Sequence, residues 1–287
     1  MFIEINRKKM LNIKRIALSA ACSIALFGAS ANAYSLPLFY DTLLEDDDFE
    51  TQGVDVNGNG LLDIGDTLTG IVDITKVLNN DNPAQQYDPL ELTAIFTTEV
   101  IGKTATSNPN LFNFEFGAVG ADGVIFQFYT DVSNDFSGGG TDCFTVADCT
   151  ARASNGNLWA EFGFTGDADE EWQAFGAPEN TDIFSQLTSD QALGSFQFAL
   201  GIITDNTGFN LQEFDLGGCG IIFACNGDGR VGLSGSGSVL GVSNLDTPFD
   251  VSSDTDFRVS ASVPEPTSIA LLGLGLLGVT ASRRKAT

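Results

Sequence analysis

The chain has 287 residues, with 38 acidic side chains against 13 basic ones, a formal net charge of −25 and no histidine. The missing histidine excludes the Ser-His-Asp and Cys-His nucleophile systems and any zinc catalyst that uses histidine ligands. An acidic surface repels nucleic acids and anionic lipids and attracts divalent cations, so no nucleic-acid partner is expected.

Residues 1–33 have the parts of a secretory signal peptide in the usual order. A basic segment is followed by an apolar run at 16–29 and then by Ala31-Asn32-Ala33, a small-x-small sequence typical of a cleavage site. Tyr34 is then the expected first mature residue. The start of translation is open between Met1 and Met10, because a start at Met10 gives a signal of more ordinary length. We expect an exported protein.

The interior of the chain is strongly acidic but still apolar enough to fold. Between residues 34 and 282 there are 37 acidic and 5 basic residues, a net charge of −32. Hydrophobic residues make up 43% of the whole chain, and there are 23 phenylalanines. About 230 residues suffice for one large domain, and no internal repeat or long linker is visible. We therefore expect one acidic domain over residues 34–262.

The segment 55–66 has the ligand spacing of a calcium loop. Oxygen-bearing side chains occupy loop positions one, three, five, nine and twelve, and Gly60 stands at position six, where such a loop turns sharply. The expected ligands are Asp55, Asn57, Asn59, the carbonyl oxygen of Leu61, Asp63 and Asp66. This pattern resembles dockerin-type and other extracellular EF-hand-like loops over these twelve residues only. The resemblance implies a structural Ca²⁺ ion.

The flank of this loop departs from the resemblance. Residues 67–74 indicate a strand, whereas an EF-hand has a helix on each side of the loop. No second repeat of the dockerin type is visible, which argues against a cohesin-binding module. An Asn-Gly-rich β-turn is the alternative interpretation of the segment.

Alternating apolar and polar residues dominate the rest of the interior and predict β-strands. The segments with this pattern are 68–74, 91–101, 111–119, 124–130, 158–164, 195–203, 238–243 and 257–263. The best candidate for a short helix is the segment 183–193. Many short strands separated by turn residues favour an all-β fold, either an antiparallel β-sandwich or a jelly-roll-like domain.

Four cysteines follow the signal peptide in two pairs of equal spacing, Cys143 with Cys149 and Cys219 with Cys225. An even number in an exported chain indicates disulfides, because the periplasm is oxidising. Three connectivities are open. We favour local pairing, because each short segment contains or adjoins a turn-capable stretch. A zinc site is disfavoured, since both the Cys-x-x-Cys spacing and histidine are missing.

One group of acidic residues near two tryptophans raises the question of glycan chemistry. The group consists of Glu161, Asp167, Asp169, Glu170 and Glu171, flanked by Trp159 and Trp172. A pair of carboxylates can hydrolyse a glycosidic bond, and tryptophan rings can stack on sugars. The same residues also fit a solvated loop beside two core tryptophans. We expect a non-catalytic protein, with a carbohydrate-binding module as the alternative and a secreted glycosidase as the less favoured one.

The last 25 residues place three features in order: Pro264-Glu265-Pro266, an uncharged apolar run at 268–281, and the basic cluster Arg283-Arg284-Lys285. A helix of fourteen residues is about 21 Å long, which is short for a hydrocarbon core of about 30 Å. We therefore expect a short transmembrane tail that inserts transiently in the inner membrane. A basic cluster on the cytoplasmic side leaves the preceding chain outside the cytoplasm.

This arrangement resembles the PEP-CTERM sorting signal, over residues 263–287 only; a tail anchor with a chance Pro-Glu-Pro is the alternative. The resemblance implies that an exosortase recognises the Pro-Glu-Pro region, removes the tail and passes the protein to the surface or matrix of a Gram-negative bacterium that makes exopolysaccharide. The interior is also loosely similar to uncharacterised PEP-CTERM proteins. In these an acidic calcium-like loop precedes β-strands, and a stretch like Ser253–Phe257 comes shortly before the sorting signal. These resemblances predict a surface or extracellular-matrix protein associated with exopolysaccharide and biofilm.

Overall fold

The structure is a computed structural model, and it describes a large part of the chain. The described residues are 38, 41–82, 84–87, 91–136, 143–178, 192–217, 227–240, 248–249 and 251–262. The chain divides into two units, Met1–Leu36 and Pro37–Thr287, and every described residue belongs to the second. The predicted signal peptide, the predicted tail beyond Ser262 and the pair Cys219 and Cys225 lie outside the described residues.

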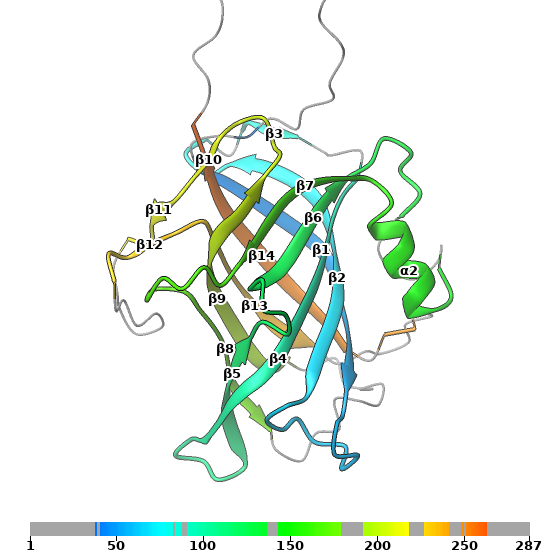
Figure 1. Ribbon diagram of the computed structural model, residues 1–287, viewed down its shortest axis with the longest axis vertical. Helices are drawn as coiled ribbons and strands as arrows, with labels where there is room; N and C mark the ends of the chain where they lie inside the picture. The colour runs from blue at the N-terminus through cyan, green and yellow to red at the C-terminus, as the bar shows by residue number, and fades with distance from the viewer. Residues whose placement is uncertain are drawn as a thin grey trace, which may run out of the picture. The chain divides into compact units, whose positions relative to one another are not determined.

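Nearly all described secondary structure is β-strand (Figure 1). The strands are β1 Thr42–Val54, β2 Thr67–Asn79, β3 Gln86–Tyr87, β4 Leu92–Ala105, β5 Leu111–Gly117, β6 Val124–Thr130, β7 Asn157–Gly163, β8 Glu171–Pro178, β9 Ala192–Asp205, β10 Leu211–Gln212, β11 Phe214–Asp215, β12 Arg230–Val231, β13 Leu233–Leu240 and β14 Val251–Ala261. One helix, α2 Val146–Ala153, is described. The predicted all-β class is confirmed.

Twelve strands form one antiparallel sheet in the order β3-β2-β1-β14-β13-β9-β7-β6-β4-β5-β8, with β10 paired to β14. An additional pairing joins β2 to β4, so the sheet closes on itself. A second additional pairing joins β8 to β9. The short strands β11 and β12 pair separately. Because the sheet is closed, the inward side chains of opposite strands share one core.

Aromatic rings fill this core. Phe126 of β6 lies at the centre, with ring centroids 5.1 Å from Phe198 of β9, 5.5 Å from Phe257 of β14 and 5.4 Å from Trp172 of β8. Large rings bury much apolar area at little cost in side-chain entropy, and tilted or edge-on contacts are favourable for them. The many phenylalanines of this acidic chain therefore supply the burial that offsets its charge repulsion.

Strand β13 contributes small residues where the rings need space. Gly235 lies opposite Phe198 and Gly237 opposite Phe196 in the β9–β13 register. A Cβ atom on Gly235 would collide with the Phe198 ring, and one on Gly237 would come within 2.7 Å of the Phe196 ring. Glycine inside a strand often marks such a close approach. The glycines in the Gly-Ser repeat of β13 thus leave room for the rings of Phe196 and Phe198.

Of the helix predicted over 183–193, only the last two residues lie among those that the structure describes. Residues 183–191 lie outside the described residues, and Ala192 and Leu193 belong to β9, so the predicted helix is wrong at those two positions. The described helix, α2, was not predicted. It packs against the sheet through Cys149 and Ala153, in a small apolar cluster with Ile71 of β2.

Candidate functional site

The predicted calcium loop connects β1 to β2 and is closed by hydrogen bonds to its first ligand. The Asp55 carboxylate accepts hydrogen bonds from the amides of Gly58 and Gly60, both at 2.6 Å, and from the amide of Asn57 at 3.1 Å. Gly58 and Gly60 have φ angles of 73° and 78°, which glycine adopts without the strain other residues suffer. The glycines of the motif therefore allow the turn that wraps the chain around Asp55.

The last predicted ligand, Asp66, is fully buried and holds the other side of the loop. Its carboxylate accepts hydrogen bonds from the amide of Val56 at 2.9 Å and from the amide of Asp63 at 2.6 Å. The backbone of Asp66 also pairs with Val100 of β4. Hydrogen bonds to Asp55 and Asp66 thus close the loop at both ends, and the backbone of Asp66 attaches the loop to β4.

Asp63 is the meeting point of the remaining loop side chains. Its Oδ2 accepts hydrogen bonds from the side-chain amides of Asn57 at 3.1 Å and Asn59 at 2.7 Å, and its Oδ1 lies 2.8 Å from the ammonium of Lys103. The hydrogen bond from Lys103, aided by those from the asparagines, lowers the pKa of Asp63 to about 2. Asp63 therefore stays ionised over the physiological range. Leu61 contributes its amide, which donates to Asn59 at 2.7 Å.

A second acidic group was missed by the sequence analysis. One carboxylate oxygen from each of Glu91, Asp131 and Asp135 lies within 4.8 Å of the others. Among the described residues, no other three acidic, cysteine or histidine side chains come as close to one another. The loop carboxylates Asp55 and Asp66 do not form such a set with Asp63. Carboxylate oxygens at this spacing can ligate a hard cation such as Ca²⁺. The structure therefore contains an acidic cluster with metal-binding geometry.

The three carboxyl groups of this cluster lie in different environments. Glu91, just before β4, is 4% exposed and accepts a hydrogen bond from the amide of Phe136 at 3.0 Å. Burial raises the pKa of Glu91, and that amide acts in the opposite direction. Hydrogen bonds from Ser133 lower the pKa of Asp131. The sequence did contain one signal for this cluster. Oxygen-bearing side chains at Asp131, Ser133 and Asp135 have the same spacing as the first three ligands expected in the loop 55–66.

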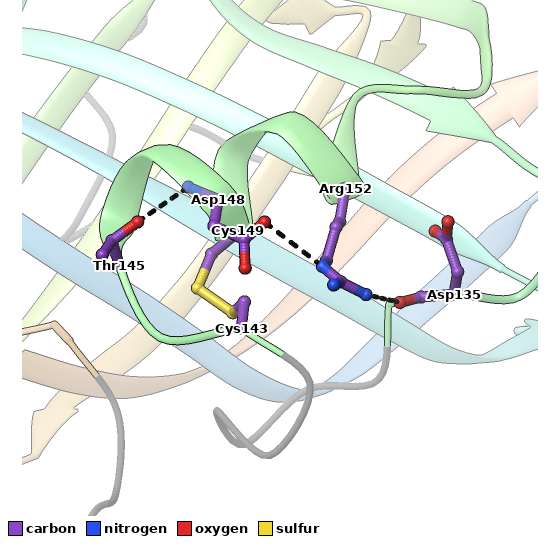
Figure 2. The surroundings of a disulfide bond; sticks show 6 residues. All are labelled: Asp135, Cys143, Thr145, Asp148, Cys149 and Arg152. Atoms are coloured by element: carbon purple, nitrogen blue, oxygen red, sulfur yellow. Dashed lines mark hydrogen bonds and ion pairs between the residues drawn. A yellow bond between two sulfur atoms is a disulfide. The ribbon is translucent and has the colours of Figure 1, made fainter.

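The disulfide and the helix α2 lie beside Asp135, one member of this cluster (Figure 2). Cys143 and Cys149 are bonded, with their Cα atoms 5.1 Å apart, so the predicted local pairing is confirmed for this pair. Thr145 caps the helix by accepting a hydrogen bond from the amide of Asp148 at 3.1 Å. Arg152 in the last turn donates to the carbonyl oxygen of Asp135 at 3.4 Å. The helix therefore fixes the segment that carries Asp135.

The two tryptophans considered for sugar stacking are both buried. Trp159 and Trp172 are each 5% exposed, and Trp172 stacks on Phe126 at an interplanar angle of 16°. Trp172 also packs against Phe96, Phe116 and Phe198, and Trp159 meets Phe128 edge-on. With both side chains buried, neither offers a flat platform at the surface. This corrects the stacking role considered for them and confirms the alternative of core residues.

The nearby carboxylates are used in different ways. Glu161 accepts hydrogen bonds from Gln127 at 2.8 Å and Thr204 at 2.5 Å. Asp169 is buried and accepts from the amides of Gly227 at 2.8 Å and Gly229 at 2.7 Å. These two groups bind the protein's own loops and strands. Glu170 likewise accepts hydrogen bonds from Thr165, Gly166 and Asp167 of its own loop, and Glu171 accepts one from Gln173; both residues also line a pocket.

Comparisons with known proteins bear on the C-terminus. Residues 262–285 match the family model of the PEP-CTERM protein-sorting motif, and this stretch contains the predicted Pro264, Glu265, Pro266, Arg283 and Arg284. A search of curated proteins and a search of solved structures gave no match. Within the described ranges, no helix has the length and hydropathy needed to span a membrane. The chain therefore carries a C-terminal PEP-CTERM sorting motif, which implies an exported protein processed by an exosortase and attached at the cell surface.

Proposed function

We propose that this protein is a non-catalytic component of the cell surface or extracellular matrix, associated with exopolysaccharide and stabilised by calcium. The observation that carries the proposal is the sorting motif at residues 262–285. Its position supports a role outside the cell for the folded part. The last described residue, Ser262, follows β14 directly, so the motif begins where the closed sheet ends. The cargo delivered by the motif is thus the β-domain itself.

The loop 55–66 supports the calcium part of the proposal. Asp55 and Asp66 are held in place by backbone amides, while Asn57 and Asn59 each accept an amide hydrogen bond and keep a second lone pair on the same oxygen. Oxygens already held by backbone amides lose little freedom when they bind a cation, although the carboxylates of Asp55, Asp63 and Asp66 must still come together around it. Calcium would compete with Lys103 for Asp63, or reach that carboxylate through a water molecule.

The charge of the chain gives calcium a structural effect. A net charge of −32 over residues 34–282 opposes the compact state through self-repulsion. A divalent ion at the entry to β2 would neutralise part of that charge and fix the loop against β4. A ligand that binds the folded state alone stabilises it by mass action. We infer a matrix protein whose stability rises with extracellular calcium.

Export and sorting are tested in cells that contain an exosortase. The wild-type chain is expected to lose its tail, and the Pro264→Ala/Pro266→Ala double variant is expected to keep it and stay in the inner-membrane fraction. Thr267→Ala, directly after Pro264-Glu265-Pro266, is the matched control and should be processed like the wild type. Intact mass and cell fractionation are the measurements. Equal processing of the double variant and the wild type would contradict the proposed sorting.

A further inference from the structure

The last strand of the sheet ends where the sorting motif begins. Strand β14 ends at Ala261, the family match starts at residue 262, and in the sequence Val263 alone separates Ser262 from Pro264. Two residues of extended chain span at most about 7 Å. An enzyme that recognises the Pro-Glu-Pro region therefore works close to the folded domain. Wherever it needs chain upstream of Val263, it meets residues that belong to the fold.

The end of β14 is held by the turn 205–212, named here the junction turn, which contains β10 (Figure 1). Strand β10 pairs with Ser260 and Ala261 of β14. The residue pairs that join β14 to β1 and to β13 stop at Val259. Among the strand pairs of the described residues, the junction turn therefore supplies the partner for the last two residues of β14.

Hydrogen bonds extend this hold to the first residue of the matched motif. The amide of Ser262 donates to the carbonyl oxygen of Asn210 at 3.1 Å, and the side-chain amide of Asn210 donates to Oγ of Ser262 at 3.0 Å. Asn210 has a φ angle of 57°, a left-handed conformation that asparagine adopts more readily than most residues. Both the backbone and the side chain of Asn210 thus bind Ser262.

The junction turn is itself fixed by a carboxylate and by burial. Asp205 accepts hydrogen bonds from the amide of Thr207 at 3.0 Å, from its hydroxyl at 2.6 Å and from the amide of Leu211 at 2.7 Å. Thr207 and Leu211 are buried, and Ala261, which pairs with Leu211, is fully buried. The turn is therefore an ordered part of the domain, and its contacts oppose the release of the end of β14.

We propose that the junction turn limits the access of the exosortase to the sorting motif, and that residues 260–262 leave the turn before the tail is removed. The inference rests on the exosortase processing in the proposed function. A peptide that binds in extended form uses its main-chain groups for hydrogen bonds to its partner. In the folded protein the junction turn already bonds to this stretch, so the turn and the enzyme compete for it.

This opening is local. Strands β1 and β13 still hold β14 up to Val259, so the closed sheet stays folded when residues 260–262 separate from the turn. Openings at the ends of elements have low free energies. When opening and closing are fast relative to cleavage, the rate of cleavage follows the population of the open form. The stability of the junction turn thus sets how long the protein stays attached to the inner membrane.

The test measures tail removal in membrane vesicles from cells that contain an exosortase, with the full-length precursor already inserted, so that export does not contribute. Asn210→Gly removes the hydrogen bond to Oγ of Ser262 and keeps the turn, because glycine accepts a positive φ. The loss of one ordinary hydrogen bond is expected to speed tail removal about fivefold. Asn206→Gly is the matched control, because its side chain in the same turn bonds to Leu158, and it should behave like the wild type.

A second variant distinguishes limited access from a general loss of stability. Gly-Ser-Gly-Ser inserted between Ser262 and Val263 gives the enzyme free chain upstream of the motif. This linker chain is expected to lose its tail faster than the wild type and to gain nothing more from Asn210→Gly. Thermal melts establish that each variant is folded.

The inference is overturned if Asn210→Gly or the linker chain is processed no faster than the wild type. It is also overturned if the gain from Asn210→Gly persists in the linker chain or is matched by Asn206→Gly. In each of these cases the wild type still loses its tail, so the proposed sorting stands. A wild type that keeps its tail would contradict the proposed function and this inference together.

Discussion

The ammonium of Lys103 lies 2.8 Å from Oδ1 of Asp63 and ties the loop 55–66 to strand β4. The side chains are 13% and 27% exposed, so the pair is partly shielded from water. The ammonium of Lys103 also lies over two phenylalanine rings, 4.9 Å from the centroid of Phe112 and 5.7 Å from that of Phe114. A resident cation thus occupies an oxygen that the calcium motif assigns to the metal.

Replacing this lysine is expected to have two opposite effects. Lys103→Gln removes the ion pair, so the calcium-free protein should lose about 1 kcal/mol of stability. The same change removes a competitor for Asp63, so the Kd for calcium should fall about threefold. Denaturant melts and calcium titration measure the two effects. Lys76→Gln, which removes a more exposed pair with Glu45, is the control and should leave calcium affinity unchanged.

A second prediction concerns Asp46, which points into the core from the bulged part of β1. It is 6% exposed; its Oδ1 accepts a hydrogen bond from the amide of Thr255 at 2.7 Å, and its Oδ2 has no partner in the described structure. Burial, with the nearby charges of Asp254 and Asp256, raises the pKa of Asp46 from 3.8 to about 8. The folded state therefore keeps a proton on Asp46 that the unfolded state loses near pH 4.

The sign of the pH effect follows from this difference. Between about pH 4 and pH 8 the folded protein binds one proton more than the unfolded chain, so stability falls with rising pH by up to about 1.4 kcal/mol per unit. Asp46→Asn keeps the acceptor for Thr255 and removes the proton, so it should flatten this decline. Chemical denaturation at several pH values, compared with the exposed Asp81→Asn control, measures it. A wild-type slope retained in Asp46→Asn would refute the assignment.

A third prediction tests the packing of glycine against phenylalanine. Gly235→Ala places a methyl group where the Phe198 ring lies, so the ring or the strand must shift. Overpacking of a tight core costs about 1–3 kcal/mol. Ser236→Ala, the exposed neighbour on the other face of β13, should change stability by less than about 0.5 kcal/mol. Equal melting temperatures for the two variants would show that the space is not tight.

The strands that sequence patterns predict best are those with one clear apolar face. The segment 124–130 was predicted with its observed ends, because Phe126 and Phe128 alternate with Gln127. Strand β1 was missed because its acidic run reads as a solvated loop, although every second residue from Thr42 to Asp46 is buried. Strand β8 was missed because a strand of charged, small and aromatic residues has a weak alternating pattern.

Features that depend on distant contacts were beyond local patterns. The pairing of β2 with β4 closes the sheet, and nothing in either strand alone specifies it. The cluster of Glu91 with Asp131 and Asp135 joins residues 40 or more positions apart, brought together because β4 and β6 are neighbours. The local pairing of Cys143 with Cys149, in contrast, needed only a short loop. The candidate calcium loop could be proposed for the same reason, since its expected ligands lie within twelve consecutive residues.

The most direct test of the account is calcium titration by calorimetry on the purified full-length protein, with Asp55→Ala, Asp66→Ala and, as controls, Glu91→Gln and Asp81→Ala. The account predicts saturable binding that is lost in both loop variants and kept in both controls, with a melting temperature that calcium raises in the wild type. Melts without calcium establish that each variant is folded. No calcium-dependent heat, or binding that disappears with Glu91→Gln and persists in Asp55→Ala, would contradict the calcium loop.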